Sequence, residues 1–337
     1  YDTVYGSLNG ITGILNDDLL NLTELMDGHP EYLSRLAQTP AMYLGSCRYK
    51  LPHYLDDDSP YVFIFKQFET YHIEAFFYIG GNDSMDTVLK LSEYGKRIGS
   101  SVRIIGIPKT IDNDLCGTDH CPGFGSAAKY IGTTFAELER DCHVYATKAV
   151  TIVEVMGRDA GWLTAASCLA RANGAKGPDF IYLCEVPFSI DTFLKDVKAK
   201  LEEQDAVIIA VSEGVKNKDG RYISEEVQSS AVDSFGHSYI AGAAKVLEDA
   251  VRNEIGCKVR SIELNLMQRC AAHLASATDI QESRMLGKTA CQYALEGATG
   301  MMAAVIRTSD KPYATEFKAL PVCDIANAIK SVPADYI

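Results

Sequence analysis

The chain has 337 residues, 47% of them apolar, which is enough for two domains with buried cores. Its formal net charge of −13 argues against a general nucleic-acid binder, because no excess of basic residues offsets phosphate repulsion. No apolar run reaches the ~18 residues of a membrane-spanning helix, and no signal-peptide pattern is present, so we expect no membrane partner. The ten cysteines are scattered without metal-type spacing, which predicts reduced thiols in a cytoplasmic protein.

The first part of the chain contains two candidate ligand-binding stretches. Residues 4–13 predict a strand running into a loop, and its three glycines permit close backbone approach to a ligand, although a plain surface loop fits equally well. Residues 41–48 predict a strand with Arg48 at its carboxyl end, where a guanidinium suits either a phosphate clamp or a solvated surface. The chain opens with Tyr1 in a strand-like stretch, so we expect its native N-terminus to be missing.

A Gly-Gly turn joins the next predicted strand to a helix. Residues 75–79 predict the buried strand, and the helix is predicted from Met85 to about Ile98. The turn and the helix N-terminus together suit an anion or a metal-bound phosphate, through backbone N–H groups and the helix dipole. A tight turn that needs glycine for packing alone is the alternative. The residues of this turn are Gly80, Gly81, Asn82, Asp83 and Ser84.

The following predicted strand, residues 102–107, ends in a cluster of chemically active side chains. Pro108 cannot continue the hydrogen-bonded ladder, and open α/β sheets bind ligands at this edge. A lysine beside an aspartate suits phosphoryl transfer, in which one neutralises phosphate charge and the other accepts a hydroxyl proton. An Asx-type turn is the other interpretation. The cluster consists of Lys109, Thr110, Asp112 and Asp114.

Strands and helices continue to alternate after this cluster, and a polar residue closes each strand. This alternation is typical of a doubly wound parallel sheet. No long linker separates two halves, so we expect domains that share crossing segments. The predicted strands are 149–156, 180–184 ending at Glu185, 206–211 ending at Ser212-Glu213-Gly214, and 261–264, and the predicted helices are 126–140, 160–172 and 286–306.

Two arginines, Arg260 and Arg269, lie nine residues apart in and just beyond the last of these strands. A substrate phosphate would use such a pair, and so would a protein interface. We interpret His273, near the start of a predicted helix, as a hydrogen-bonded helix residue rather than a catalyst.

Several short motifs follow one another along nearly the whole chain: LGSCR at 44–48, GGNDS at 80–84, PKTIDND at 108–114, MGR at 156–158, an acidic strand end at Glu185, and R-x8-R at 260–269. Together they resemble the phosphofructokinase family, whose first strand and glycine-rich phosphate loop are absent here. The resemblance implies an α/β fold of two doubly wound, mainly parallel-sheet domains. The implied parts are a phosphoryl-donor domain (1–125 plus 267–305), a sugar-phosphate domain (126–266) and a C-terminal segment (306–337).

The resemblance also implies a role for each matching residue. Asp112 resembles the base that takes the proton from the 1-hydroxyl of fructose 6-phosphate, and Arg48 would steady the transferred phosphoryl group. Thr110 and Asp114 would hold the sugar and the metal-bound phosphates. The implied sugar-phosphate contacts are Met156, Gly157, Arg158, Glu185, Arg269 and, from a neighbouring subunit of a homodimer or homotetramer, Arg260. The implied donor contacts are Gly80, Gly81, Asp83 and Ser84, and the implied Mg²⁺ ligands are Asn82, Asp83 and Asp114.

Two departures from the ATP-using members of the family bear on the phosphoryl donor. Those members have glycine where this chain has Asp83, whose side chain would crowd and repel an α-phosphate. They also have glycine in place of Lys109, which can neutralise a compact pyrophosphate. Both residues resemble the pyrophosphate-dependent branch, which acts reversibly on fructose 6-phosphate in glycolysis and gluconeogenesis.

Other departures concern the metal, the sugar and regulation. Asn82 stands where the family usually has a magnesium-binding aspartate, although an amide oxygen can still ligate a hard cation. Leu266 removes a sugar contact, and Ala149 replaces an arginine that reaches the neighbouring site, for which Lys148 is a substitute. Residues 203–205 replace the basic residues of nucleotide-regulated members, so we expect no such regulation there.

We therefore expect a pyrophosphate-dependent phosphotransferase acting on fructose 6-phosphate. One alternative keeps the fold and uses ATP, with Asn82 as the feature that favours it. A second is a non-catalytic sugar-phosphate sensor whose metal site has decayed. A dinucleotide oxidoreductase is disfavoured, because the glycines occur as adjacent pairs without the G-x-G-x-x-G spacing.

Overall fold

The computed structural model describes residues 2–39, 41–226 and 242–337. The chain divides into two compact units, which are described separately. The predicted domain boundary lies at residue 125, and the corresponding piece of unit 1 ends at Pro122. The predicted C-terminal segment 306–337 is not separate: its residues up to Ala328 belong to unit 1, and the rest belong to unit 2. Unit 1 comprises Tyr1–Thr110, Leu115–Pro122 and Ala277–Ala328, and unit 2 comprises Ile111–Asp114, Gly123–Ser276 and Ile329–Ile337.

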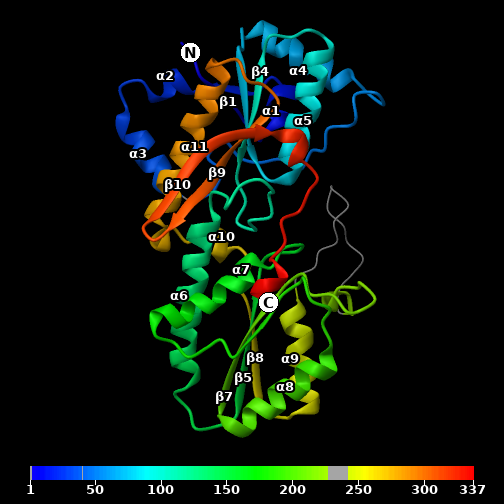
Figure 1. Cartoon of the computed structure of the whole chain (residues 1–337), viewed down its shortest axis with the longest axis vertical. Helices are drawn as coiled ribbons and strands as arrows, with labels where there is room; N and C mark the ends of the chain where they lie inside the picture. Colours follow the sequence, from blue (N-terminus) through cyan, green and yellow to red (C-terminus); the bar gives the residue numbers. More distant parts are fainter. Residues whose placement is uncertain (1, 40, 227–241) are drawn as a thin grey trace. The chain divides into compact units, whose positions relative to one another are not determined.

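Unit 1 is built on a four-stranded sheet in the order β10-β9-β4-β3. Its strands are β3 (Ala75–Gly80), β4 (Arg103–Pro108), β9 (Met301–Asp310) and β10 (Tyr313–Pro321), and β10 alone among them runs antiparallel to its neighbour. Successive side chains of a strand point to opposite faces. Ile104 therefore packs with helices α4 (Ser59–Thr70) and α5 (Asn82–Arg97), and Ile105 packs with α11 (Ala277–Leu295) on the other face. Figure 1 shows these helices beside the sheet.

The beginning of unit 1 differs from the sequence prediction. The strand expected within residues 4–13 is a short one, β1 (Tyr5–Ser7), which pairs with β2 (Leu19–Asn21) around α1 (Ile11–Leu15). Helices α2 (Leu22–Met26) and α3 (Pro30–Gln38) follow. The strand predicted at residues 41–48 is wrong, because Ala41 and Gly45 have φ angles of 73° and 76° and the Gly45 N–H closes a turn onto the Met42 carbonyl.

The predicted helix 286–306 is correct only in its first part. Helix α11 ends at Leu295, and β9 begins at Met301. Gly297 and Gly300 both have positive φ angles, which end the helix, and Met301 then pairs with Ile105 of β4. The methionine- and alanine-rich start of β9 favours a helix by local propensity, but pairing within the sheet overrides it.

Unit 2 contains a second four-stranded sheet, in the order β6-β7-β5-β8, and all its strands are parallel. Val150 and Ile152 of β5 pack with one helical layer, and Val153 and Val155 pack with the other. This arrangement confirms the predicted α/β class with mainly parallel sheets (Figure 1). The strands are β5 (Ala149–Val155), β6 (Phe180–Tyr182), β7 (Ala206–Ser212) and β8 (Lys258–Glu263).

Helices cover both faces of this second sheet. One face carries α8 (Ile190–Glu203) and α9 (Ala243–Glu254), and the other carries α6 (Phe124–Cys142) with α7 (Trp162–Ala165) and the 3₁₀ helix η1 (Ala166–Asn173). Within the described parts of the chain, no helix is both long and apolar enough to cross a membrane. The short elements η2 (Ile223–Glu226), α10 (Met267–Cys270), η3 (Ala272–Leu274), η4 (Val322–Asp324) and η5 (Ala334–Tyr336) complete the two units.

Candidate active site

In unit 1, the carboxyl ends of β3 and β4 lie side by side. Gly80 is in register with Pro108, and the Lys109 N–H donates to the Gly80 carbonyl at 2.9 Å. A Cβ atom added at Gly81 would lie 3.7 Å from the Lys109 carbonyl oxygen and 3.9 Å from Thr110 Cβ, which are ordinary van der Waals distances. Packing within unit 1 therefore does not require glycine at position 81. Glycine at this position does allow a ligand to approach the backbone closely.

Helix α5 begins directly at this Gly-Gly turn. A Cβ atom at Gly80 would clash with the Ser84 side chain in the first turn of the helix, so here packing does require glycine. Asp83 is exposed in the same turn, and Lys109 is exposed at the end of β4. Backbone N–H groups at a helix N-terminus and a nearby ammonium favour a compact, highly charged anion.

The Asn82 side chain, predicted as a magnesium ligand, holds the C-terminal part of unit 1. Its Nδ2 donates to the Ala328 carbonyl at 2.8 Å, and its Oδ1 accepts the Asn327 N–H at 2.8 Å. Asn327 in turn donates to Asp86 at 3.1 Å. The amide oxygen of Asn82 has a second lone pair, so these bonds still leave one for a cation.

Arg48 lies in an irregular segment that is held against the loop after β1. The Asn9 N–H donates to the Leu44 carbonyl at 2.7 Å, and the Asn9 side chain donates to the Ser46 carbonyl at 3.2 Å. Arg48 itself is exposed. The structure therefore places the LGSCR motif beside the loop after β1, although the motif does not lie in a strand.

The stretch after β4 passes from unit 1 to unit 2 between Thr110 and the next residue. Thr110 is buried at the end of its unit. Asp112 and Asp114 belong to unit 2, where they flank Asn113, which is buried and has a φ angle of 57°. Asparagine tolerates this left-handed conformation better than most residues.

In unit 2, the carboxyl ends of β5 and β7 are joined by direct hydrogen bonds. The Gly157 N–H donates to Glu213 Oε1 at 3.2 Å, and the Ser212 hydroxyl donates to the Gly157 carbonyl at 2.7 Å. A Cβ atom at Gly214 would clash with the backbone carbonyl of Arg158. This close approach fixes the MGR loop against the end of β7.

Glu213 is a half-buried carboxyl group that was absent from the predicted site residues. The pKa of Glu213 is raised from 4.5 to about 7, mainly by burial and further by the negative charge of Asp112. The hydrogen bond from the Gly157 N–H and the positive charge of Arg158 act in the opposite direction and lower this pKa. Asp112, Arg158 and Glu213 therefore lie close enough to interact electrostatically. In the sequence, Glu213 is marked only by its position as an acidic residue directly after the strand that forms β7. Glu213 also lines a small cavity of about 30 Å³ with Glu154, Val155, Met156, Glu263, Asn265 and Gln268.

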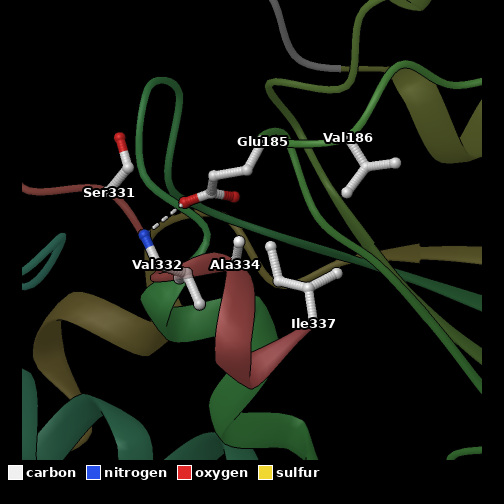
Figure 2. A pocket seen from close by; sticks show the side chains of 6 residues that line it. All are labelled: Glu185, Val186, Ser331, Val332, Ala334 and Ile337. Atoms are coloured by element: carbon white, nitrogen blue, oxygen red, sulfur yellow. Dashed lines mark hydrogen bonds between the residues drawn. The ribbon is translucent and has the colours of Figure 1, made fainter.

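Glu185, predicted as a sugar-phosphate contact, binds the C-terminal segment of unit 2. Its Oε1 accepts the Gly161 N–H at 2.8 Å and the Val332 N–H at 2.9 Å, and Figure 2 shows its carboxylate turned toward Val332. Glu185 thus lines a different cavity from Glu213. This open cavity of about 580 Å³ is lined by Glu185, Val186, Ser331, Val332, Ala334 and Ile337.

The two predicted phosphate-binding arginines occupy different places in unit 2. Arg260 is exposed and in register with Thr151, four residues before the end of β5, which puts it about 13 Å from the carboxyl edge of the sheet. Arg269 is exposed in α10, next in sequence to Gln268, whose Oε1 accepts the Met156 N–H at 3.3 Å. Within one subunit, α10, which carries Arg269, contacts the MGR loop through Gln268, whereas Arg260 lies on β8 away from the carboxyl edge.

The Phosphofructokinase family model matches residues 1–313. The chain belongs to the phosphofructokinase family. A curated relative, the pyrophosphate--fructose 6-phosphate 1-phosphotransferase of Methylococcus capsulatus, is 37% identical over 99% of the chain and 79% of its own length. A sulfofructose kinase of Alkalicoccus urumqiensis is 33% identical over 95% of the chain and 80% of its own length. The crystal structure of the pyrophosphate-dependent phosphofructokinase from Marinobacter aquaeolei aligns with a TM-score of 0.85 at 34% identity, covering 99% of the chain and 78% of that structure.

Proposed function

We propose that this phosphofructokinase transfers a phosphoryl group reversibly from pyrophosphate to the 1-hydroxyl of fructose 6-phosphate. The observation that carries the proposal is the position of Lys109 beside the Gly80–Gly81 turn, with Asp83 in the first turn of α5. Lys109 and the helix N-terminus supply positive charge for a compact anion, and Asp83 adds a negative charge that an α-phosphate would meet.

The proposed chemistry on the sugar side starts from Asp112. Its carboxylate accepts the proton of the 1-hydroxyl, the oxygen forms a bond to phosphorus, and the bridging P–O bond of pyrophosphate breaks to release orthophosphate. Arg158 and Arg269 bind the sugar phosphate through charge-assisted hydrogen bonds. Glu213, close to both Asp112 and Arg158, offers a carboxyl group to the sugar hydroxyls.

Magnesium is the proposed cofactor, with Asp83 and Asp114 as its protein ligands and Asn82 as a third oxygen donor. These oxygen donors suit Mg²⁺, which usually binds one or two carboxylates and keeps waters and substrate phosphates as further ligands. Asn82 can bind the ion because its amide oxygen has two lone pairs, of which the Asn327 N–H occupies only one. When bound, the ion would neutralise charge on the phosphates.

A homo-oligomer is part of the proposal, because Arg260 stands away from the carboxyl edge of its own sheet. An exposed arginine on the edge strand β8 is suited to reach the site of a second copy of the chain. The proposed location is the cytoplasm, consistent with the ten cysteines being free thiols.

A donor-swap assay tests the proposed function. Initial rates are measured for the protein with magnesium and either pyrophosphate or ATP, and with either fructose 6-phosphate or sulfofructose as acceptor. We expect kcat/KM with pyrophosphate to exceed that with ATP by at least about 100-fold, and Lys109→Met to abolish most of this preference. Lys96→Met, at the far end of α5, is the matched control. Equal or faster turnover with ATP, or a preference for sulfofructose, would contradict the assignment.

A further inference from the structure

The C-terminal segment of unit 2 places Lys330 against the turn that contains Asp112. The Lys330 N–H donates to the Asp114 carbonyl at 2.8 Å, and its ammonium group donates to Asn113 Oδ1 at 3.3 Å. On the opposite side, the Lys330 carbonyl accepts the indole N–H of Trp162 at 2.8 Å, and the ammonium lies 5.6 Å from the centre of the indole ring. Both its backbone and its side chain thus connect the turn to α7.

The turn depends on partners of this kind. Asn113 is buried with a positive φ angle, a conformation that surrounding contacts must maintain. Its side-chain oxygen would lose a hydrogen bond if Lys330 were absent. Asp112 and Asp114 flank Asn113 directly, so the conformation of Asn113 determines where both carboxylates point.

Glu185 fixes the same segment at a second point. Two residues after Lys330, the Val332 N–H donates to the Glu185 carboxylate (Figure 2). The same carboxylate also accepts the N–H of Gly161, which precedes Trp162. Lys330 is therefore held by its own hydrogen bonds to Asn113 and Asp114 and, two residues further on, by the hydrogen bond of Val332. Hydrogen bonds of this type restrict the positions of the groups that they join.

We infer that Lys330 is a positioning residue for Asp112, which holds the Ile111–Asp114 turn in its reactive conformation through Asn113 and Asp114. This inference rests on the proposed function, in which Asp112 is the base. A base that is displaced by about 1 Å loses on the order of 10²-fold in rate, while substrate binding by other residues persists. Lys330 would then affect kcat far more than the KM for the sugar phosphate.

The test compares Lys330→Met and Lys330→Arg with the wild-type protein by steady-state kinetics. We expect Lys330→Met to lower kcat by about 10- to 100-fold with less than about a threefold change in the sugar-phosphate KM. Lys330→Arg, which keeps a donor for Asn113, should restore part of the rate. The control is Lys318→Met, which removes an exposed lysine paired with Glu316 on β10.

A double-mutant cycle and fluorescence complete the experiment. If Lys330 acts through Asn113, the Asn113→Ala/Lys330→Met protein should be no slower than the slower single variant. Trp162 is the only tryptophan, so its emission should change in Lys330→Met and not in Lys318→Met.

The outcomes separate the two proposals. A kcat of Lys330→Met within about twofold of wild type, additive losses in the cycle, or a lowered Tm without rescue by arginine would overturn the role of Lys330. Wild-type turnover with ATP but not with pyrophosphate would refute the proposed function instead, and the role of Lys330 would still be judged from the ratio of variant to wild-type kcat measured with ATP.

Discussion

Replacing Glu213 by glutamine should stabilise the ligand-free protein above neutral pH. Glu213 is half-buried at the end of β7, where desolvation and the neighbouring Asp112 raise its pKa from 4.5 to about 7. A tenfold change in an ionisation constant corresponds to about 1.4 kcal/mol, so this rise corresponds to about 3 kcal/mol. The glutamine side chain has nearly the same shape but never carries the charge.

The sign of the pH dependence follows from proton binding. Between pH 4.5 and about 7, the unfolded chain has lost the Glu213 proton while the folded protein keeps it, so stability falls as the pH rises. Below pH 4.5 both states are protonated, and the variant should match the wild type. Above about pH 7.5 the full difference of about 3 kcal/mol should be present, which raises the Tm by about 6–12 °C in a domain of this size.

Thermal unfolding of wild type and Glu213→Gln between pH 4.5 and 8.5 measures this effect. Glu202→Gln, an exposed substitution on α8, should leave the Tm unchanged at every pH. Loss of a carboxylate beside Arg158 should also raise the sugar-phosphate KM at pH 8. A Tm difference that is equal at all pH values, or a less stable variant at pH 8, would show that the Glu213 carboxyl group does not keep its proton in the folded protein.

Four other substitutions test separate parts of the structure. Asp112→Asn should lower kcat by about 10²- to 10⁴-fold with little change in the sugar-phosphate KM, as steady-state kinetics would show. Burial disfavours the charged form of His120, but its hydrogen bonds to Asp119 and Glu282 outweigh this and raise its pKa. Its stabilisation is present below the ordinary histidine pKa and is lost as the pH rises through the raised value, so His120→Gln should lower the Tm more at pH 6 than at pH 9. Gly214→Ala should raise the sugar-phosphate KM at least about tenfold by displacing the Arg158 backbone, whereas Gly287→Ala, with open space around it in α11, should raise the Tm slightly.

The sequence was sufficient for the parts of the fold whose signal is local. The runs of apolar residues that form β3, β4, β5 and β7 predict strands by themselves, and the polar residues after them mark the carboxyl edge. The prediction for residues 41–48 was wrong because their apolar character suggested a strand. Positive φ angles at Ala41 and Gly45 prevent these residues from forming one. The start of β9 was wrongly predicted as helix because it becomes a strand only through its pairing with β4, which is distant in sequence.

The candidate site was predictable where short motifs encode it and not where distant segments meet. The neighbouring positions of Gly80 and Lys109 follow from two strands that are consecutive in sequence. Lys330 contacts Asn113 across 217 residues, and no motif marks it. The strand pattern does not distinguish Glu185 from Glu213, because both are acidic residues that follow a strand, and only their hydrogen bonds tell them apart.

The most direct test of the account is ³¹P NMR of the wild-type protein with magnesium, pyrophosphate and fructose 6-phosphate. We expect orthophosphate and fructose 1,6-bisphosphate to form in equal amounts, and the same final ratio to be reached when the reaction starts from those products. Orthophosphate released without any phosphorylated sugar product, or no reaction until ATP is added, would contradict the account.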